Sequence, residues 1–564
     1  MLLVLFTWFY LFFTLITLGF GLVKITTLKP NHFFIHFLLG LVTTTILATI
    51  WAIFGRINWE FHIFLIVVQA AVFLFSKEEI KALYSTILKS FYSLSNKTKG
   101  FLIVVLLLTL AQSAKASYFV DNETYYVQTI KWLTEFGLVK GLGNLHIFLG
   151  QTSGWHILQS VFSFSFFGNC YNDLNGFCLV MATFCSVCFW DSISKKQERH
   201  FLVLAIFPIA NLALFPFLGS PSPDFAVYMI SFFVFYYFLE NFKSTSVSDF
   251  NLIFILSSFI VFVKITALPI LLLPLLLWML HFKKLASKVL GSYLFGLLVL
   301  CLFGIKNTIL TGYPFFPSNI VAFDFAYTLP KEVYQFSFNP AKQYDFFISS
   351  QEFRKLEPLA IVFKWIFDSK IYSVFNSLLL VLLLGIPIYL KQFLNERKYW
   401  MLYLAMMVQC LFLLATSPQY RFFLNYELFF GLVVLAHFIP TRIGILKMSY
   451  WSLLPLFFLV LFSQKIKSNF QDNLTFKETT FLFRSMLFPA ENSQLKTHFH
   501  QTKTGNVRYY SPDSSTYIWA TGNGKLPCVS DTQIKYLKNK TGYIPQLRTD
   551  LLKDGFYSQK SNTP

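Results

Sequence analysis

The chain has 564 residues, of which 55% are hydrophobic and only 13% are charged. A soluble domain usually carries roughly 25% charged residues, so this chain could not cover a water-facing surface. The composition therefore excludes a soluble enzyme and predicts an all-α polytopic membrane protein. The net charge of +19 would suggest nucleic acid in a soluble protein. In a membrane protein it indicates Lys and Arg in cytoplasmic loops, so we expect no nucleic-acid partner.

The first apolar segment, residues 1–23, has a length that also suits a signal peptide. It has no basic region at its start and no small-residue cleavage site before Lys24. We therefore expect it to be retained as the first membrane-spanning helix.

Apolar segments of membrane-spanning length continue to about residue 463, and we expect about fourteen spans. The stretch 253–280 reads either as two short helices that meet at Thr266–Pro269 or as one broken helix. In chain order, the expected spans are 1–23, 33–54, 59–76, 101–116, 174–190, 201–218, 223–240, 251–264, 266–280, 289–304, 373–390, 399–416, 421–439 and 447–463.

Basic residues recur in alternate loops, and the positive-inside rule assigns those loops to the cytoplasm. The clusters are Lys77, Lys81, Lys89, Lys97 and Lys99; Lys195, Lys196 and Arg199; Lys283, Lys284 and Lys288; Lys391, Arg397 and Lys398; and Arg442 and Lys447.

The opposite side then holds two long loops, near 117–173 and 306–372, and a short loop with the sequence GSPSPD (219–224). Residues 464–564 are polar and lack a further apolar run, so they predict a small extracytoplasmic domain after a membrane domain of residues 1–463. No internal repeat is visible.

The seven Cys residues are scattered, and none forms a metal-type or redox spacing with a His. Only Cys170 and Cys528 fall in expected outer segments, where they could pair.

Two carboxylates open the first long outer loop, in the run SYFVDNETYYVQTIKWL. Asp121 and Glu123 follow directly after a span, where carboxylates are costly unless they face water, a cation or a polar cavity. Such a group can remove a proton from a hydroxyl or hold a divalent metal. The structural alternative is that Asp121 caps a helix over 124–136 and Glu123 favours its dipole.

The same loop continues with glycines and polar groups set among aromatic residues, which is typical of a partly helical, amphipathic segment along the membrane surface. Asn144, His146 and His156 are candidate substrate-binding residues. The two His residues are candidates for acid–base chemistry or sugar contacts, and the alternative is that they are interfacial residues without chemistry.

Charged residues also recur at the outer ends of other spans: Asp224 after SPSP, Lys264, Lys306 and Arg421 after TSPQY. Charges at this depth usually face a water-filled cavity or each other, so we expect Arg421 and Lys264 to share one polar pocket. Arg and Lys can hold a phosphate, and the alternative is that they extend to the lipid headgroups. The chain has no Walker, Rossmann or HExxH motif, which argues against ATP-driven transport by this chain alone.

A span followed by an outer loop with the acidic motif Asp121-Asn122-Glu123 resembles the GT-C superfamily of integral membrane glycosyltransferases. The resemblance implies a GT-C-like helical bundle and a polyprenyl-phosphate-linked sugar donor that enters from the membrane lipid. It implies Asp121 as the base for an acceptor hydroxyl, with Glu123 orienting it or helping to bind Mg or Mn. Lys264, Lys306 and Arg421 would then bind the phosphate.

Over nearly the whole chain, the sequence resembles an uncharacterised family of bacterial multi-pass proteins. The matching runs are DNETYYVQTIKWLTEFGLVKGLGNLH, SPSPD, NTILTGYPFFPSN, TSPQYRF and LPCV…LRTDLLKDGF. This resemblance implies a multi-pass protein of the bacterial inner (plasma) membrane. Where that family has a His in the first run and a second Cys before LPC, this chain has Tyr126 and the stretch YIWA. No role for that His and no such disulfide carries over.

Three other functions stay open at this point. A transporter or flippase for lipid-linked glycans would also need intramembrane charges, although inverted repeats are typical of such proteins. A glycan polymerase of another fold would rely on arginines more than on an early acidic pair. A structural membrane protein would not need charges gathered at one face.

Overall fold

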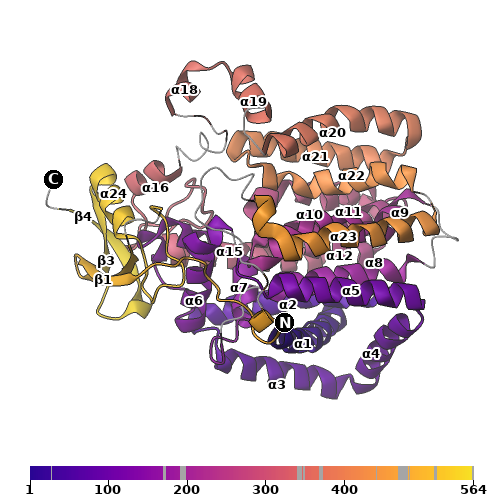
Figure 1. Cartoon of the computed structure of the whole chain (residues 1–564), viewed down its shortest axis with the longest axis horizontal. Coiled ribbons are helices and arrows are strands. Elements are labelled where there is room, and N and C mark those ends of the chain that lie inside the picture. The colour runs from indigo at the N-terminus through magenta and orange to yellow at the C-terminus, as the bar shows by residue number, and fades with distance from the viewer. Residues whose placement is uncertain are drawn as a thin grey trace.

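The computed structural model describes the chain except for residues 27, 118, 169–172, 191–197, 339–345, 347, 349, 368–371, 440, 468–480, 482, 514–516 and 562–564. Most of the described residues are helical, and the strands lie at one end of a helix bundle (Figure 1). The longer helices run side by side (Figure 1). Apolar segments form helices in lipid because a helix satisfies the backbone hydrogen bonds of the segment internally.

The α-helices lie in the following order along the chain. They are α1 (Leu2–Thr26), α2 (Phe33–Phe54), α3 (Trp59–Phe75), α4 (Lys77–Tyr92), α5 (Asn96–Ser113), α6 (Val127–Glu135), α7 (Gly154–Val161), α8 (Asp173–Cys188), α9 (Arg199–Ala205), α10 (Phe207–Leu214), α11 (Pro223–Asn241), α12 (Val247–Val263), α13 (Leu272–Leu280), α14 (Phe282–Leu285), α15 (Leu290–Thr311), α16 (Lys331–Phe338), α18 (Ser350–Lys355), α19 (Pro358–Phe367), α20 (Tyr372–Phe393), α21 (Arg397–Thr416), α22 (Leu424–Phe438), α23 (Arg442–Lys467) and α24 (Asp531–Thr541).

Short helical turns of other types connect them. Asn122–Tyr126 (η1) is π-helical, and the 3₁₀ turns are η2 (Leu142–Asn144), η3 (Ile147–Gln151), η5 (Phe215–Gly219), η6 (Ile265–Leu271), η7 (Tyr420–Phe422), η8 (Phe483–Met486) and η9 (Leu552–Asp554). The strands are β1 (Phe499–Thr504), β2 (Val507–Pro512), β3 (Tyr543–Leu547) and β4 (Phe556–Lys560), which pair antiparallel as β1–β2 and β3–β4.

Six helices in the described part of the chain are long and apolar enough to cross a membrane: α1, α2, α15, α20, α21 and residues Arg442–Leu461 of α23. Two bent helix pairs, α3 with α4 and α9 with the segment Phe207–Gly219, bring the number to eight if each pair is one span. The prediction of a mostly helical, multi-pass membrane protein is confirmed.

The sequence predicts about fourteen spans, which is more than this number. The other expected spans fall on α5, α8, α11, α12, α13 and α22, which are shorter or less apolar than the six long helices. Between residues 253 and 280 the helix is broken: α12 ends at Val263, Lys264 is extended, and the 3₁₀ turn η6 contains Pro269. Proline lacks the backbone N–H that an unbroken helix requires there.

The first two helices pack with almost no space between their backbones. A Cβ atom on Gly19 would lie 1.7 Å from the His36 carbonyl oxygen, and one on Gly40 would lie 1.9 Å from the Leu15 oxygen. Small residues permit this close approach, which is a common source of helix association in lipid.

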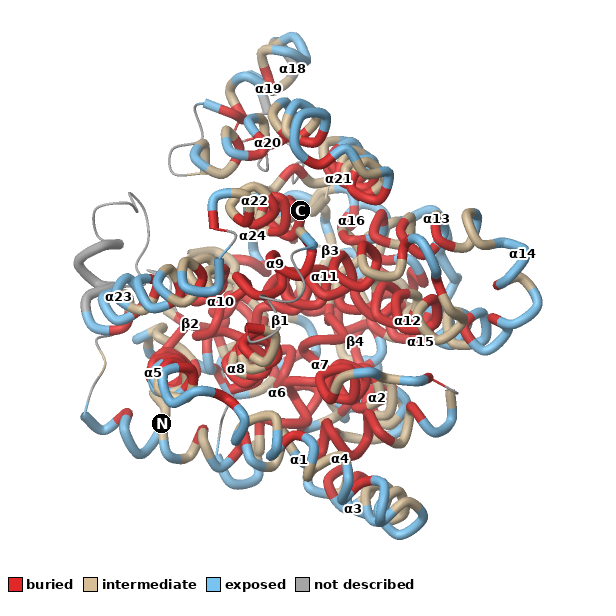
Figure 2. Tube along the Cα trace, turned by 90° about the vertical axis from the view of Figure 1, so that its right-hand side faces the viewer, coloured by how far each residue is buried: buried red, intermediate tan, exposed pale blue. Residues whose placement is uncertain are grey.

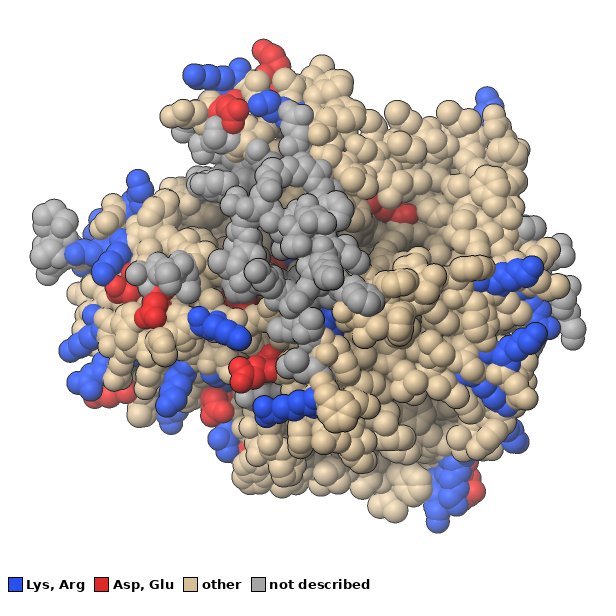
Figure 3. All heavy atoms as spheres, viewed as in Figure 1, with Lys and Arg blue, Asp and Glu red and all other residues tan. Residues whose placement is uncertain are grey.

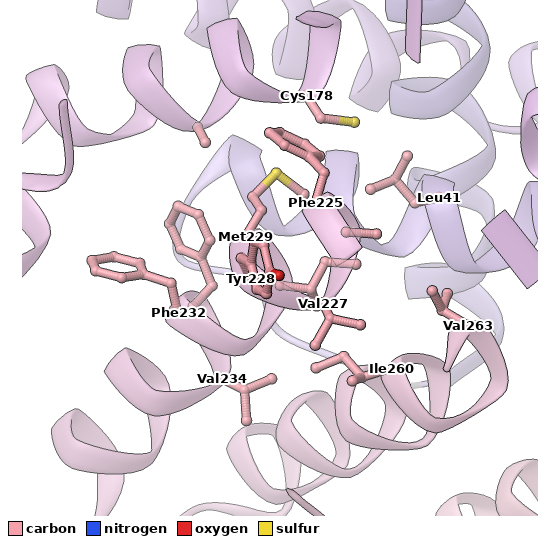
Figure 4. Close-up of a cluster of buried hydrophobic side chains, with 14 of the residues drawn as sticks. Leu41, Cys178, Phe225, Val227, Tyr228, Met229, Phe232, Val234, Ile260 and Val263 are labelled. Carbon is pink, nitrogen blue, oxygen red and sulfur yellow. The ribbon is translucent and has the colours of Figure 1, made fainter. Parts of the chain in front are cut away.

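Burial is concentrated in the middle of the bundle, and the peripheral helices expose apolar side chains (Figure 2). α11 is buried along nearly its whole length and packs against α2, α8 and α12 through side chains such as Leu41, Cys178 and Ile260 (Figure 4). By contrast, α20 exposes Val374, Val381, Leu384 and Ile388. An exposed apolar surface of this kind suits contact with lipid. The buried helix α11 carries Asp224 in its first turn.

The first long loop, residues 117–173, is folded rather than spread along a surface. Its α6 and α7 bury Trp132 and Trp155 completely. The C-terminal part, which we define as residues 483–561 where described, packs on this loop: the Phe556 N–H donates to the Lys140 oxygen at 2.9 Å. Cys528 in this part is a buried free thiol, while its suggested partner Cys170 lies outside the described residues.

Candidate functional site

Four charged residues from distant parts of the chain meet at one place, and we call them the charged cluster. Asp121 directly precedes η1, and Asp224 lies in the first turn of α11. Lys264 joins α12 to η6, and Arg421 lies in η7 between α21 and α22. Each therefore lies at a helix end or break, where a charged side chain leaves the apolar interior.

The charges alternate along the cluster. Arg421 Nη1 lies 2.6 Å from Asp121 Oδ2 and 3.6 Å from Asp224 Oδ2. The other oxygen of Asp224 pairs with Lys264 Nζ. The side chains of Asp121, Arg421 and Lys264 are 26%, 23% and 19% exposed, whereas Asp224 is 2% exposed. Three of the four side chains are thus partly exposed, and Asp224 is the buried member that lies between the two cations.

Neighbouring side chains hold this arrangement in place. Arg421 Nε donates to Gln419 Oε1 at 2.8 Å, and the Tyr228 hydroxyl donates to the Arg421 carbonyl oxygen at 2.5 Å. Lys264 Nζ lies 3.9 Å from the centre of the Phe422 ring, a cation–π contact. The Tyr126 hydroxyl donates to Asp121 Oδ2 at 3.3 Å. Preorganised groups of this kind need little reorganisation when a ligand arrives.

The ion pair sets the protonation of Asp121. Burial alone would raise the pKa of its carboxyl, but the charge and hydrogen bond of Arg421 oppose this and bring the pKa below its usual range. The same pair raises the pKa of Arg421 well above its usual value despite burial. Asp121 is therefore an ionised carboxylate at neutral pH, able to accept a proton but weakly basic while Arg421 holds it.

His156 and Lys306 lie beside the start of α7. The Ser153 N–H donates to His156 Nδ1 at 3.4 Å, which leaves the ring proton on Nε2, and that atom has no hydrogen-bond partner among the described residues. Burial lowers the pKa of His156 to about 3, so the ring is neutral. Lys306 is buried, donates to the Thr152 oxygen at 2.7 Å and has no carboxylate partner in the described part.

The N-terminus of α7 connects these two residues to the charged cluster. The Ser153 hydroxyl donates at 2.6 Å to the Val263 oxygen, the residue before Lys264. The His156 ring lies 4.7 Å from the Tyr126 ring, whose hydroxyl reaches Asp121. The site therefore contains the neutral His156 ring, which can donate through Nε2, and the buried Lys306 amine, next to the charge-balanced cluster.

Glu123 does not join Asp121, although the sequence suggested them as a pair. Residues two apart share a face only in extended backbone, and η1 is π-helical. The fully buried Glu123 carboxylate instead accepts hydrogen bonds from the Gln494 N–H at 2.9 Å and from the Ser493 hydroxyl.

A divalent metal does not fit these residues. Asp121 and Asp224 share Arg421, and Glu123 faces the C-terminal part. No group of three or more His, Cys, Asp or Glu suitable for a metal occurs among the described residues.

Asn144 and His146 stabilise the first long loop through hydrogen bonds to other parts of the chain and within the loop. The Asn144 amide donates to the Tyr327 oxygen at 2.8 Å, and its oxygen accepts from the Ser558 hydroxyl at 2.7 Å. His146 Nδ1 accepts from the Phe148 N–H at 3.3 Å and so caps η3. No described contact joins either residue to the charged cluster.

The sequence reasoning missed Tyr126, Tyr228 and Gln419, which support the cluster. Gln419 belongs to the run TSPQYRF, so its place beside an Arg was a usable signal. Tyr228 lies among aromatic residues in an apolar helix, and nothing in that pattern distinguishes it from core.

Neither a search of curated proteins nor a search of solved structures finds a match for this chain. One family model, described as "Domain of unknown function (DUF8201)", matches residues 1–428. The matched residues include the whole charged cluster and end before the C-terminal part. Because the match covers most of the chain, the protein belongs to the DUF8201 family.

Proposed function

We propose that this protein is a membrane glycosyltransferase of the GT-C type. It moves a sugar from a polyprenyl-phosphate-linked donor to the hydroxyl group of an extracytoplasmic acceptor. The observation that carries the proposal is the half-buried carboxylate Asp121, held 2.6 Å from Arg421 and adjoining Lys264. This combination supplies a proton acceptor and phosphate-binding cations in one place.

The reaction follows from these roles. Asp121 takes the proton of the acceptor hydroxyl, and the hydroxyl oxygen forms a bond to the anomeric carbon of the sugar. The bond between that carbon and the phosphate oxygen breaks, and polyprenyl phosphate leaves with the electron pair. Arg421, Lys264 and Lys306 stabilise the negative charge that develops on the leaving phosphate.

Donor binding also activates the base in this scheme. A phosphate competes with Asp121 for the forked guanidinium of Arg421, which binds phosphate well. When Arg421 turns to the phosphate, Asp121 loses its closest positive charge, and burial then raises its pKa. The carboxylate becomes a stronger base only after the donor is in place.

The test is reconstitution of the purified protein in liposomes with polyprenyl-phosphate-linked sugars from the host membrane. We expect mass spectrometry to detect free polyprenyl phosphate together with sugar attached to an acceptor. Movement of intact donor across the bilayer without cleavage would instead indicate a transporter or flippase. Joining of whole glycan chains would indicate a polymerase.

The family resemblance favours a bacterial plasma-membrane location, and the arrangement of charge supports an orientation with the charged cluster and the C-terminal part outside the cytoplasm. The turns α4–α5, α20–α21 and α22–α23 lie at the bundle end opposite the strands (Figure 1). On the face shown in Figure 3, Lys and Arg gather at that end and around the C-terminal part, with a largely uncharged band between. The loops at the bundle end opposite the strands carry the basic clusters that mark a cytoplasmic side.

Cysteine labelling tests this orientation. A membrane-impermeant maleimide added to intact cells should label Lys140→Cys and Lys540→Cys, which replace exposed side chains. Lys391→Cys, exposed in the last turn of α20, should be labelled only after the membrane is permeabilised. Labelling of position 140 or position 540 alone would show that the proposed topology is wrong.

A further inference from the structure

The backbone that carries Asp121 has an uncommon form. η1 is a π-helical turn, in which the Val127 N–H bonds to the Asn122 oxygen. π-helical turns are rare and less favourable than α-helix, and they often occur at functional sites. Surrounding contacts must therefore stabilise this turn.

The C-terminal part supplies those contacts on several sides of η1. The Asn122 amide donates to the Asn492 oxygen at 2.8 Å, and the Glu123 carboxylate binds Ser493 and the Gln494 N–H. The Glu123 carbonyl oxygen accepts from the N–H groups of Thr521 and Gly522, each at 2.8 Å.

Further bonds fix the residues on both sides of Glu123. The Tyr517 hydroxyl lies 2.8 Å from Thr124 Oγ1 and 3.2 Å from the Val120 oxygen. In α6, the Gln128 amide donates to the carbonyl oxygens of Gly522 and Gly524 at 3.1 and 2.9 Å.

We propose that residues 492–495 and 517–524 together form a clamp that holds η1 in its π-helical form and so positions Asp121 against Arg421. Glu123 is the main attachment point, a positioning residue rather than a catalytic one. The geometric statement stands without the proposed function, and only its consequence for sugar transfer rests on that function.

The chemistry of Glu123 supports this role. It is fully buried, and its carboxylate is bound by hydrogen-bond donors from the C-terminal part and from Asn122, with no cation bound to it in the described residues. A clamp needs an acceptor oxygen at this position and does not need the charge. A metal ligand or an acid–base group would need the charge itself. Glu123→Gln keeps an acceptor oxygen, so it separates the two roles.

Hydrogen–deuterium exchange of the full chain in lipid nanodiscs tests the clamp. Glu123→Ala should speed exchange at least about tenfold in both 492–495 and 119–126, because the buried donors Ser493 and Gln494 then lose their acceptor oxygen. Glu123→Gln should stay near the parent. Glu135→Gln removes the same charge at the exposed end of α6 and should change neither segment. Where Glu123→Ala does not fold, Ser493→Ala should give the same pattern from the other side.

Two results would overturn the clamp. Faster exchange in 492–495 with 119–126 unchanged would mean that the C-terminal part contacts the loop without stabilising η1. Equal effects of Glu123→Gln and Glu123→Ala would mean that the charge is what matters. Exchange is measured without a transfer assay, so this outcome is separate from the fate of the proposed function.

Discussion

Asp121→Asn should lower the rate of sugar transfer by about 10²–10⁴-fold, the range that a general base typically contributes. Asn has nearly the same size and can still accept the Arg421 and Tyr126 hydrogen bonds, but it cannot take a proton from the acceptor. The variant should therefore insert and fold like the parent, and initial rates in proteoliposomes measure the loss.

Asp324→Asn is the matched control, because Asp324 is an exposed carboxyl group in another long loop. It should transfer sugar at the parent rate. Full activity of Asp121→Asn would make Asp121 a partner of Arg421 and nothing more, and the transporter and polymerase alternatives would then be favoured.

If the protein transfers sugar as proposed, the pH dependence of that activity in the parent should show whether donor binding activates Asp121. The profile of kcat/KM reports the free enzyme, and that of kcat reports the enzyme–substrate complex. In the free protein the pKa of Asp121 is below its usual range, so kcat/KM should not fall through its protonation between about pH 5 and 8. If a phosphate takes Arg421 away, kcat should fall at a higher pH than kcat/KM does. Identical acidic limbs in the two profiles would contradict this scheme.

Individual charged residues of the site were visible in the sequence, because a charge at the end of an apolar segment is costly without a partner. For that reason the sequence predicts Asp121, Asp224, Lys264 and Arg421 as candidate site residues. Their pairing was harder to foresee: Asp121 and Arg421 are 300 residues apart, and only the packing of α5, α11 and α21–α22 brings them together.

The contacts of Glu123 could not be predicted, because the direction of its side chain relative to Asp121 depends on the backbone conformation of residues 121–126. No sequence pattern predicts a π-helical turn. Two residues spaced by two lie on the same face in an extended backbone and on different faces in a helix. Its partners Ser493 and Gln494 lie in a polar segment where such residues are ordinary. The fold was easier to predict, since apolar length and basic loops are strong physical signals, whereas broken and short helices such as α12–α13 blur the number of spans.

Arg421→Ala should destabilise the protein on the order of 2 kcal/mol or more, because it leaves Asp121 and Asp224 without their shared cation. The loss should depend on pH. In the parent, the lowered pKa of Asp121 means that the ion pair stabilises the fold above the pKa of the unfolded state and is lost only in strong acid. Without Arg421, burial raises the pKa of Asp121, so the variant should be less impaired at about pH 5 than at about pH 8. Thermal unfolding in nanodiscs at both pH values measures this.

Two companion variants separate charge from geometry at Arg421. Arg421→Lys should recover much of the stability, yet raise KM for the donor, because a single ammonium group cannot replace the forked contacts of a guanidinium with a phosphate. The double variant Arg421→Ala with Asp121→Asn should lose less stability than the sum of the single changes, since it removes both partners of the 2.6 Å ion pair. Strict additivity would show that the two residues do not interact in the membrane-embedded protein. A donor KM equal to that of the parent in Arg421→Lys would show that the forked contacts of Arg421 do not bind the phosphate, and would leave Lys264 and Lys306 as the phosphate-binding residues.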